Sequence, residues 1–485
     1  MFASRLRDAT LLRQQAFYAG AWQGAINGET LPVINPSSGE VLCTIPALGA
    51  EETQRAIDYA EAARKSWGKT TNASRALLLE KWHQLILDNA DDLAVIMTAE
   101  QGKPLAEAKG EVLYGAGFVK WFAEEARRIY GDTIPAPSED RRILVLKQPV
   151  GVAAAITPWN FPIAMITRKV APALAAGCPI IVKPSELTPL SALALVELAQ
   201  RAGIPAGVLQ VVTGLPKEIG ETLTGSRTVR KISFTGSTRV GQLLMQQSAD
   251  SIKRLSLELG GNAPLIVFDD ADLDIAISGI MISKFRNAGQ TCVCANRILV
   301  QRGIYPKVVE RLLAEVAKLK VGDGFADGST IGPLINAAAV AKVNAHISDA
   351  EQLGATVLTG GVSSGDGTFV APTVLGDVTT QMRIAHEETF GPVAPLFIFD
   401  TEEEAINMAN DTPFGLGAYF FTENIRRAWR VGEALEFGMV GFNTGSVSLE
   451  VAPFGGIKLS GIGREGSRYG IEEYLESKAF HFGSL

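Results

Sequence analysis

The chain has 485 residues, of which 47% are hydrophobic and 20% are charged, and its formal net charge at pH 7 is −7. This length exceeds what one hydrophobic core usually supports and indicates a globular protein of two domains. The negative charge and the lack of a basic run argue against a nucleic-acid partner, while four scattered cysteines and four unpaired histidines argue against a disulfide framework and a metal site.

The first third of the chain is predicted to be mostly helical and to end in a hairpin. Residues 1–20 lack the apolar run of a secretory signal, and later apolar stretches are interrupted before they reach membrane-spanning length. We therefore expect a cytoplasmic protein with no membrane contact. Apolar residues recur at helical spacing between residues 51 and 128, and two prolines before residues 143–146 favour a hairpin at 130–150 that leaves the main body.

Short β-branched runs then alternate with helical segments, which predicts a parallel sheet with crossover helices. The predicted strands are 152–157, 180–183, 208–212, 231–234 and 265–268. Ligands on such sheets bind beyond the carboxyl ends of the strands. Distinctive residues follow three of these ends, at 159–162, 183–186 and 235–241, so we expect a nucleotide site there. Residues 261–460 mix helices and strands again, and residues 474–485 favour a strand that pairs with another subunit.

A thiol and a carboxylate have the setting of a covalent catalyst. Cys292 lies among small and polar residues, which is typical of a reactive thiol and unusual for a structural one. Upstream, Glu258 precedes Gly260 and Gly261, which let the backbone approach another group closely. The simpler interpretations are an inert buried thiol and an ion pair between Glu258 and a neighbouring lysine or arginine. Cys292 therefore has the setting of a nucleophile, and a thiol with a carboxylate is enough for covalent catalysis.

Six short motifs occur in order along the chain and together resemble the aldehyde dehydrogenase superfamily. They lie at residues 158–162, 234–237, 257–261, 289–292, 388–392 and 453–456. Three further segments, 166–170, 284–287 and 292–294, are most similar to the succinate-semialdehyde and glutarate-semialdehyde dehydrogenases. The resemblance implies an α/β fold: a Rossmann-like NAD(P)-binding domain (1–128 and 149–260), a catalytic domain (261–460), and oligomerisation segments (129–148 and 461–485) that build a homodimer or homotetramer.

The resemblance also implies catalytic roles for individual residues. Cys292 attacks the aldehyde to give a thiohemiacetal, which becomes a thioester after hydride has passed to nicotinamide. The side-chain amide of Asn160 and the backbone N–H of Cys292 stabilise the oxyanion. Glu258 activates the water that hydrolyses the thioester, and Lys169 influences the ionisation of Glu258 or Cys292. For Asn160, a cap of the following turn is the simpler alternative.

A nicotinamide dinucleotide is the cofactor that the resemblance implies. The residues expected to bind it are Trp159, Lys183, Glu186, Gly236, Ser237, Gly241, Glu388 and Phe390. Gly236 and Ser237 open a helix whose N-terminus suits the pyrophosphate, and Lys183 and Glu186 meet the adenosine ribose. Because a carboxylate hydrogen-bonds a free ribose diol and repels a 2′-phosphate, Glu186 favours NAD, and NADP stays possible.

Two arginines decide the predicted substrate class. Without the resemblance, salt bridges to other acids would be the preferred interpretation of both. With it, we expect Arg168 and Arg286 to bind the far carboxylate of a small-molecule semialdehyde, with a hydroxyl from Ser448. We favour succinic semialdehyde, and glutaric semialdehyde or a broader aldehyde range stays open. Cys294 either packs inertly or forms a labile disulfide with Cys292.

Three other functions fit parts of the sequence. An enzyme that transfers the acyl group to coenzyme A would not need Glu258 as a base. A catalytically silent binding protein would not need Cys292, Glu258 and Asn160 together, and a cysteine hydrolase would leave the nucleotide site without a purpose. The sequence therefore favours NAD(P)-dependent oxidation of a semialdehyde to a dicarboxylate.

Overall fold

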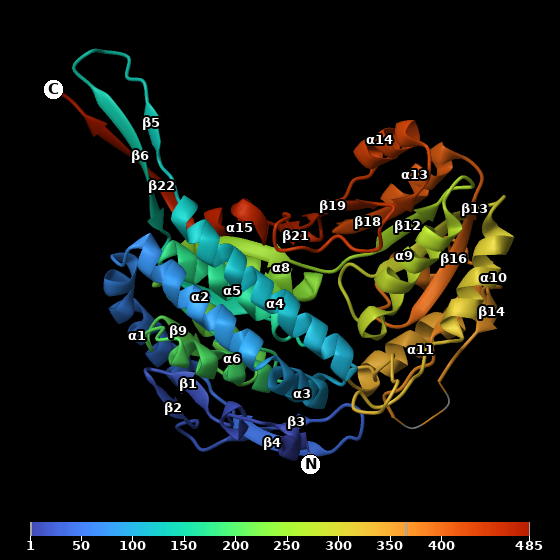
Figure 1. Ribbon diagram of the computed structural model, residues 1–485, viewed down its shortest axis with the longest axis horizontal. Coiled ribbons are helices and arrows are strands. Elements are labelled where there is room, and N and C mark those ends of the chain that lie inside the picture. The colour runs from blue at the N-terminus through green and yellow to red at the C-terminus, as the bar shows by residue number, and fades with distance from the viewer. Residues whose placement is uncertain (1, 364, 366, 485) are drawn as a thin grey trace.

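The computed structural model describes residues 2–363, 365 and 367–484, so residues 1 and 485, at which several predicted ranges begin or end, lie outside the described part. It has two lobes, each built on a mostly parallel sheet with helices packed against it, and a narrow sheet that projects from the first lobe (Figure 1). The predicted α/β fold is confirmed. Each described helix is too short or too polar to cross a membrane.

The first lobe is built on a sheet with the order β2–β1–β9–β8–β7–β10–β11–β21. Its strands are β1 (Ala16–Tyr18), β2 (Ala21–Gln23), β7 (Val152–Ile156), β8 (Ile180–Lys183), β9 (Leu209–Val211), β10 (Val229–Thr235), β11 (Arg254–Glu258) and β21 (Gly461–Ile462). Its helices are α1 (Ala50–Gly68), α2 (Asn72–Asp88), α3 (Ala90–Gln101), α4 (Leu105–Glu125), α5 (Ala164–Ala176), α6 (Leu190–Arg201), α7 (Pro216–Gly225) and α8 (Thr238–Ser248). The predicted helical character of residues 51–128 is thus confirmed.

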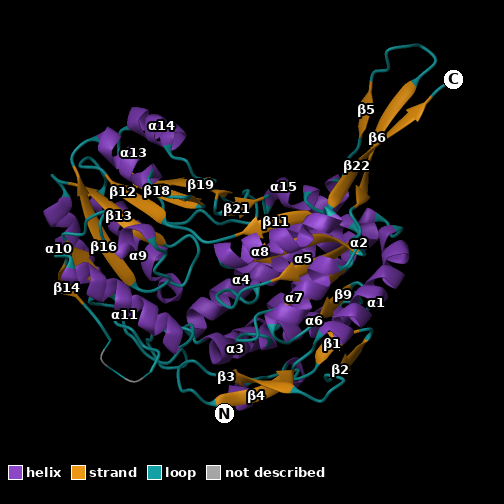
Figure 2. Cartoon of the chain, turned by 180° about the vertical axis from the view of Figure 1, so that it is seen from behind, coloured by secondary structure: helices purple, strands orange, loops and turns teal. Residues whose placement is uncertain are grey.

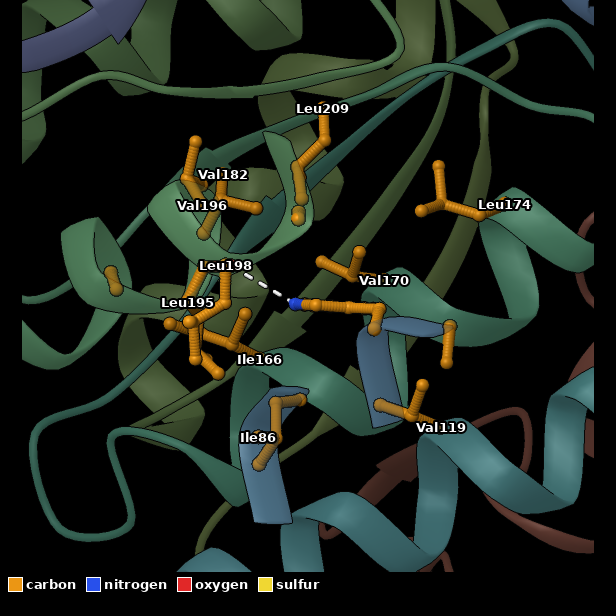
Figure 3. Close-up of a cluster of buried hydrophobic side chains, with 14 of the residues drawn as sticks. Ile86, Val119, Ile166, Val170, Leu174, Val182, Leu195, Val196, Leu198 and Leu209 are labelled. Atoms are coloured by element: carbon orange, nitrogen blue, oxygen red, sulfur yellow. Dashed lines mark hydrogen bonds between the residues drawn. The ribbon is translucent and has the colours of Figure 1, made fainter. Parts of the chain in front are cut away.

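Both faces of this sheet are covered, because successive side chains of a strand point to opposite faces. On β7, Ala153 and Ala155 pack into a core with α2, α4, α5 and α6, while Val152 and Ala154 pack on the other face with α1 and α7. Figure 3 shows the first of these cores, in which Ile166 and Val170 of α5 meet Leu195 and Leu198 of α6. Buried aliphatic residues on both faces explain the continuous apolar runs.

The second lobe is built on a sheet with the order β14–β15–β16–β13–β12–β18–β19. Its strands are β12 (Ala263–Val267), β13 (Ala295–Gln301), β14 (Thr356–Thr359), β15 (Thr373–Gly376), β16 (Val393–Phe399), β18 (Gly417–Phe421) and β19 (Met439–Phe442). Its helices are α9 (Leu273–Phe285), α10 (Tyr305–Val316), α11 (Ala337–Gln352), α12 (Arg383–His386), α13 (Glu402–Asn410) and α14 (Ile425–Ala434). The predicted strand at 265–268 belongs here, so its assignment to one sheet with the four runs before it is wrong.

The predicted hairpin is formed by β5 (Asp132–Ile134) and β6 (Arg142–Pro149), and it leaves the main body as expected (Figure 2). The C-terminal strand β22 (Leu475–Phe482) pairs with β6 of the same chain over its whole length. The residues just before β22 join the first lobe, because β21 pairs with β11 and α15 (Ser467–Glu472) packs on α4 and α5. Two small antiparallel sheets complete the fold: the hairpin of β3 (Thr30–Ile34) with β4 (Val41–Pro46), and the pair of β17 (Phe414–Gly415) with the distant β20 (Ile457–Lys458).

Candidate active site

Cys292 lies in a loop between α9 and β13 whose backbone is tightly constrained. The loop begins with the 3-10 turn Arg286–Gly289, in which Asn287 and Ala288 have left-handed backbone angles (φ of 51° and 54°). The backbone of Gly261 lies against this loop, since a Cβ there would stand 2.4 Å from the carbonyl oxygen of Cys292. The close approach predicted for the Gly260–Gly261 pair is therefore confirmed, and its partner is the thiol loop.

Asn160 follows β7 in the first lobe, and hydrogen bonds join it to the thiol loop. Its side-chain Nδ2 donates to the carbonyl of Gln290 at 3.0 Å, and Nδ2 of Asn287 donates to the carbonyl of Asn160 at 3.0 Å. A side-chain amide has two N–H bonds, so one remains after the bond to Gln290. The amide is fixed beside the Cys292 loop with one donor to spare, which is the arrangement that an oxyanion donor needs.

Cys292 lines two different cavities. The first is also lined by Arg168, Arg286 and Ser448, three residues expected to bind substrate. The second has a volume of about 260 Å³ and is lined by Asn160 and by five residues expected to bind the nucleotide: Trp159, Gly236, Ser237, Glu388 and Phe390. Cys292 therefore lines both the cavity of the expected substrate residues, called the substrate cavity below, and that of the expected nucleotide residues, called the nucleotide cavity.

Two guanidinium groups give the substrate cavity its positive character. Arg168 is buried and forms an ion pair with Glu465, its Nε lying 2.5 Å from Oε2, while its Nη2 has no hydrogen-bond partner among the described residues. Arg286 is exposed, lies 4.8 Å from the ring centroid of Phe161, and makes no ion pair within the described part of the chain. The salt-bridge interpretation therefore holds for Arg168, which nevertheless retains a free N–H, and fails for Arg286.

Ser448 lines the same cavity, together with Tyr114, a residue that the sequence did not indicate. Tyr114 of α4 lines it, and its hydroxyl forms a hydrogen bond with the hydroxyl of Ser448. Tyr114 comes from the first lobe and Ser448 from the loop after β19, so this contact joins the two lobes across the cavity. These hydroxyls and the two guanidinium groups are suited to binding an anion.

The nucleotide cavity lies at the N-terminus of α8. Ser237 caps this helix by accepting from the backbone N–H of Val240, and a Cβ on Gly236 would stand 2.4 Å from the ring of Phe234. Trp159 and Phe390 pack edge to face, with ring centroids 5.6 Å apart. A helix N-terminus and a close-lying glycine suit a pyrophosphate, so the lining fits a dinucleotide.

Three of the residues predicted to bind the nucleotide, Lys183, Glu186 and Gly241, do not line this cavity and contact other residues of the protein. Lys183 and Glu186, at the end of β8, form an ion pair with Nζ and Oε2 2.9 Å apart. Gly241 lies within α8, and a Cβ there would stand 2.4 Å from the side chain of Leu259. Close packing of the helix against the segment after β11 therefore explains Gly241.

Burial controls the ionisation of the reactive groups. It raises the pKa of the Cys292 thiol to about 12, although the positive charge of Arg168 lowers it. Burial and the negative charge of Glu465 raise the pKa of Glu258 well above its ordinary value, against the charges of Arg168 and Lys169. Both carboxylate oxygens of Glu258 are buried without a hydrogen-bond partner in the described structure. The free protein therefore holds a protonated thiol beside an acid that binds its proton tightly.

Lys169 forms an ion pair with Glu465, and its charge also lowers the pKa of Glu258. Its Nζ forms an ion pair with Oε1 of Glu465 and donates to the hydroxyl of Ser233 at 3.1 Å. Although burial raises it, the charges of Lys169 and Arg168 hold the pKa of Glu465 below its ordinary value. Glu465 is thus a buried anion of the site that the sequence analysis missed; its only signal is an acid between Gly463 and Gly466.

The second cysteine of the loop does not pair with the first. Cys292 and Cys294 are both free thiols, and the buried Cys294 donates to the carbonyl of Lys284 at 3.5 Å. No cluster of potential metal ligands occurs among the residues that the structure describes.

The sequence model of the aldehyde dehydrogenase family matches residues 22–480. The chain belongs to this family. Among curated aldehyde dehydrogenases, the glutarate-semialdehyde dehydrogenase of Pseudomonas putida is 61% identical and the succinate-semialdehyde dehydrogenase [NADP(+)] of Escherichia coli (strain K12) is 58% identical, each covering 98% of both chains. The crystal structure of succinate-semialdehyde dehydrogenase from Burkholderia pseudomallei is 57% identical, covers 99% of this chain and 100% of that one, and has a TM-score of 0.98. The chain is therefore an aldehyde dehydrogenase enzyme, and the resemblance stated from its motifs is confirmed.

Proposed function

We propose that the protein oxidises succinic semialdehyde to succinate with a nicotinamide dinucleotide as hydride acceptor. The observation that carries this proposal is the cation pair in the thiol cavity: Arg168 and Arg286 both line it, and both have N–H groups without an acid partner among the described residues. A substrate with an aldehyde at one end and a carboxylate at the other satisfies the thiol and these cations together. Relatives named for semialdehydes support the same substrate class.

In the proposed reaction, the Cys292 sulfur attacks the aldehyde carbon while the far carboxylate is bound by the arginines. The aldehyde oxygen becomes an oxyanion, which the free N–H of the Asn160 amide and the backbone N–H of Cys292 stabilise. The thiol must first lose its proton, and we assign this proton to Glu258. The negative charges of Glu388 and Glu258 both raise the pKa of the thiol. When bound, the oxidised nicotinamide supplies the acceptor for the hydride.

Glu258 is the proposed base for thioester hydrolysis, although its buried carboxylate lines neither cavity. Neither oxygen has a hydrogen bond within the described residues, so no hydrogen bond would be broken if the side chain turned toward the sulfur. Burial keeps its pKa high, which makes it a better proton acceptor once ionised than an ordinary carboxylate. The positive charges of Arg168 and Lys169 oppose this rise, because they stabilise the ionised form of Glu258.

For the nucleotide we favour NAD over NADP. Glu186 is part-exposed beside Lys183 at the carboxyl end of β8, where its negative charge suits a free ribose diol and repels a 2′-phosphate. Within the cavity itself, Glu388 accepts from the backbone N–H of Gly261 at 3.1 Å, and burial raises its pKa to about 7. A hydrogen bond from a ribose hydroxyl would stabilise its ionised form.

The proposal is tested by the absorbance of reduced nicotinamide with succinic semialdehyde, in parallel with NAD and NADP, for the wild type and Cys292→Ala. We expect turnover that is faster with NAD and is lost in the variant. Faster turnover with NADP would overturn only the nucleotide preference. No turnover with either nucleotide, while butyraldehyde reacts, would overturn the proposed substrate class.

Glutaric semialdehyde is the second candidate substrate, because the Pseudomonas putida relative at 61% identity is named for it. It carries the same two functional groups with one more methylene between them. The ratio of kcat/KM for the two semialdehydes decides between them. If kcat/KM for glutaric semialdehyde exceeds that for succinic semialdehyde, the five-carbon compound is the preferred substrate.

We further propose that the projecting sheet and β22 join copies of the chain into a homo-oligomer, dimer or tetramer. β22 is an edge strand of this sheet, and Ile134, Leu146 and Phe480 expose large apolar side chains on it. Unpaired edges and exposed apolar side chains are typical of association surfaces. Light scattering after size exclusion, on the wild type and on Phe480→Glu, tests this. The cytoplasmic location stays a prediction, and whether Cys294 packs inertly or forms a labile disulfide with Cys292 stays open.

A further inference from the structure

A buried ammonium group with no role in the proposed reaction lies directly behind Asn160. Lys103 follows α3 and is 2% exposed, and its Nζ donates to the backbone carbonyl of Asn160 at 2.7 Å. The same Nζ lies 2.5 Å from Oε2 of Glu111 and 4.1 Å from the ring centroid of Phe161. Burying a charge is costly unless it is paired and hydrogen-bonded. Here the buried charge is directed at the peptide of the oxyanion donor.

The partner of Lys103 fixes the chain on the other side of Asn160. Oε1 of Glu111 accepts from the backbone N–H groups of Ile163 and Ala164, at 2.9 and 3.2 Å. These N–H groups open α5, and a carboxylate at a helix N-terminus is favourable. The ion pair between Lys103 and Glu111 therefore holds the segment from Asn160 to Ala164 at both ends.

The same part of the first lobe also holds the thiol loop. Asn287 of that loop has two partners there. Its backbone N–H donates to Oε2 of Glu107 at 3.0 Å, and its side-chain Oδ1 accepts from Nε2 of Gln101 at 3.1 Å. Asn287 has a left-handed backbone and donates to the carbonyl of Asn160, the oxygen that Lys103 also contacts. Residues 101–111 thus bind both Asn160 and the loop that carries Cys292.

We infer that Lys103 is a positioning residue of the reaction: it fixes the Asn160 peptide, so that the side-chain amide of Asn160 is aimed at the oxyanion formed on Cys292. Oxyanion donors act only within about 2.7–3.1 Å of the developing charge. A misplacement of about 1 Å can reduce turnover about 100-fold. This inference rests on the proposed function, because it requires Asn160 to be the oxyanion donor.

A double-mutant cycle tests it. Lys103→Met alone leaves Glu111 as an unpaired buried charge, so the cycle also uses Lys103→Met combined with Glu111→Gln, a neutral pair whose amide oxygen still accepts from the start of α5. Each is made in the wild type and in Asn160→Ala. We measure kcat at saturating semialdehyde, the KM for nucleotide, and the melting temperature, which establishes that each variant is folded.

We expect Asn160→Ala to reduce kcat about 100-fold. The neutral pair is expected to reduce kcat about tenfold in the wild type and less than twofold in Asn160→Ala, with the KM for nucleotide unchanged, because it acts through the amide that is already absent. Equal losses in the two backgrounds, or full activity of the folded neutral pair, overturn the inference. If Asn160→Ala itself retains full kcat, the proposed oxyanion role fails first, and the positioning role fails with it.

Discussion

Replacing Arg286 by methionine separates recognition of the remote carboxylate from the chemistry at Cys292. Arg286 is exposed, lines the substrate cavity and has no acid partner among the described residues. Its removal therefore breaks no ion pair among these residues, and it replaces the cation–π contact with Phe161 by an apolar one. Arg168 is less suitable for this test, because its loss would deprive Glu465 of an ion-pair partner.

The size of the effect follows from the interaction that is lost. A hydrogen bond to a charged group contributes about 1.5–3 kcal/mol, and the exposure of Arg286 places the effect at the lower end of this range. Since about 1.4 kcal/mol corresponds to a factor of ten, we expect kcat/KM for succinic semialdehyde to fall about tenfold in Arg286→Met. For butyraldehyde, which has the same chain length and no carboxylate, we expect a change of less than twofold.

The assay is the initial rate of nicotinamide reduction with each aldehyde, at low and at high salt. Arg286→Lys is the matched control, because it keeps the charge and loses the planar fork, and we expect an intermediate loss. Added salt should raise the wild-type KM for the semialdehyde and leave that of Arg286→Met unchanged. An equal loss of kcat/KM for both aldehydes, or no loss for either, would refute the assignment of Arg286 to the carboxylate.

Three further changes test other parts of the site. Because burial raises the pKa of the Cys292 thiol to about 12, its alkylation by iodoacetamide in the free enzyme should rise about tenfold per pH unit from pH 7 to 10, followed by mass spectrometry; a plateau below pH 9 would contradict this. The charge of Glu465 raises the pKa of Glu258, so Glu465→Gln should shift the acid limb of the kcat profile to lower pH, and an unchanged limb would show that the two carboxyls do not interact. Glu186→Ser should lower the KM for NADP about tenfold, by removing repulsion worth about 1.4 kcal/mol beside Lys183; an unaltered ratio of NADP to NAD use would remove the basis for the NAD preference.

Local patterns carried most of the correct predictions. The thiol loop was recognisable because Cys292 is surrounded by small and polar residues, and the glycines after Glu258 indicated the close backbone contact that the structure has at Gly261. The strands of the first lobe followed from β-branched runs. A buried run, however, does not reveal which sheet it joins, and the chain passes from one lobe to the other just before the strand that begins at Ala263.

Residues that reach the site from elsewhere gave no local signal. Tyr114 and Lys103 lie in a region where the spacing of apolar residues indicates helices and does not show what the polar side chains contact. Glu465 contacts Arg168 and Lys169 only because α5 and the C-terminal segment pack together. From the sequence, a salt bridge and a place in the cavity lining were treated as alternative roles for Arg168. The structure shows both, because one guanidinium group has several N–H groups that can bind different partners.

Because Cys292 lines two cavities, a group bound to its sulfur lies at the boundary between them. In the proposed reaction, an acyl group on the sulfur would occupy the cavity lined by Arg168 and Arg286, and the other cavity would hold the nucleotide. A reagent that modifies the sulfur from either cavity would therefore place its adduct at the boundary of both.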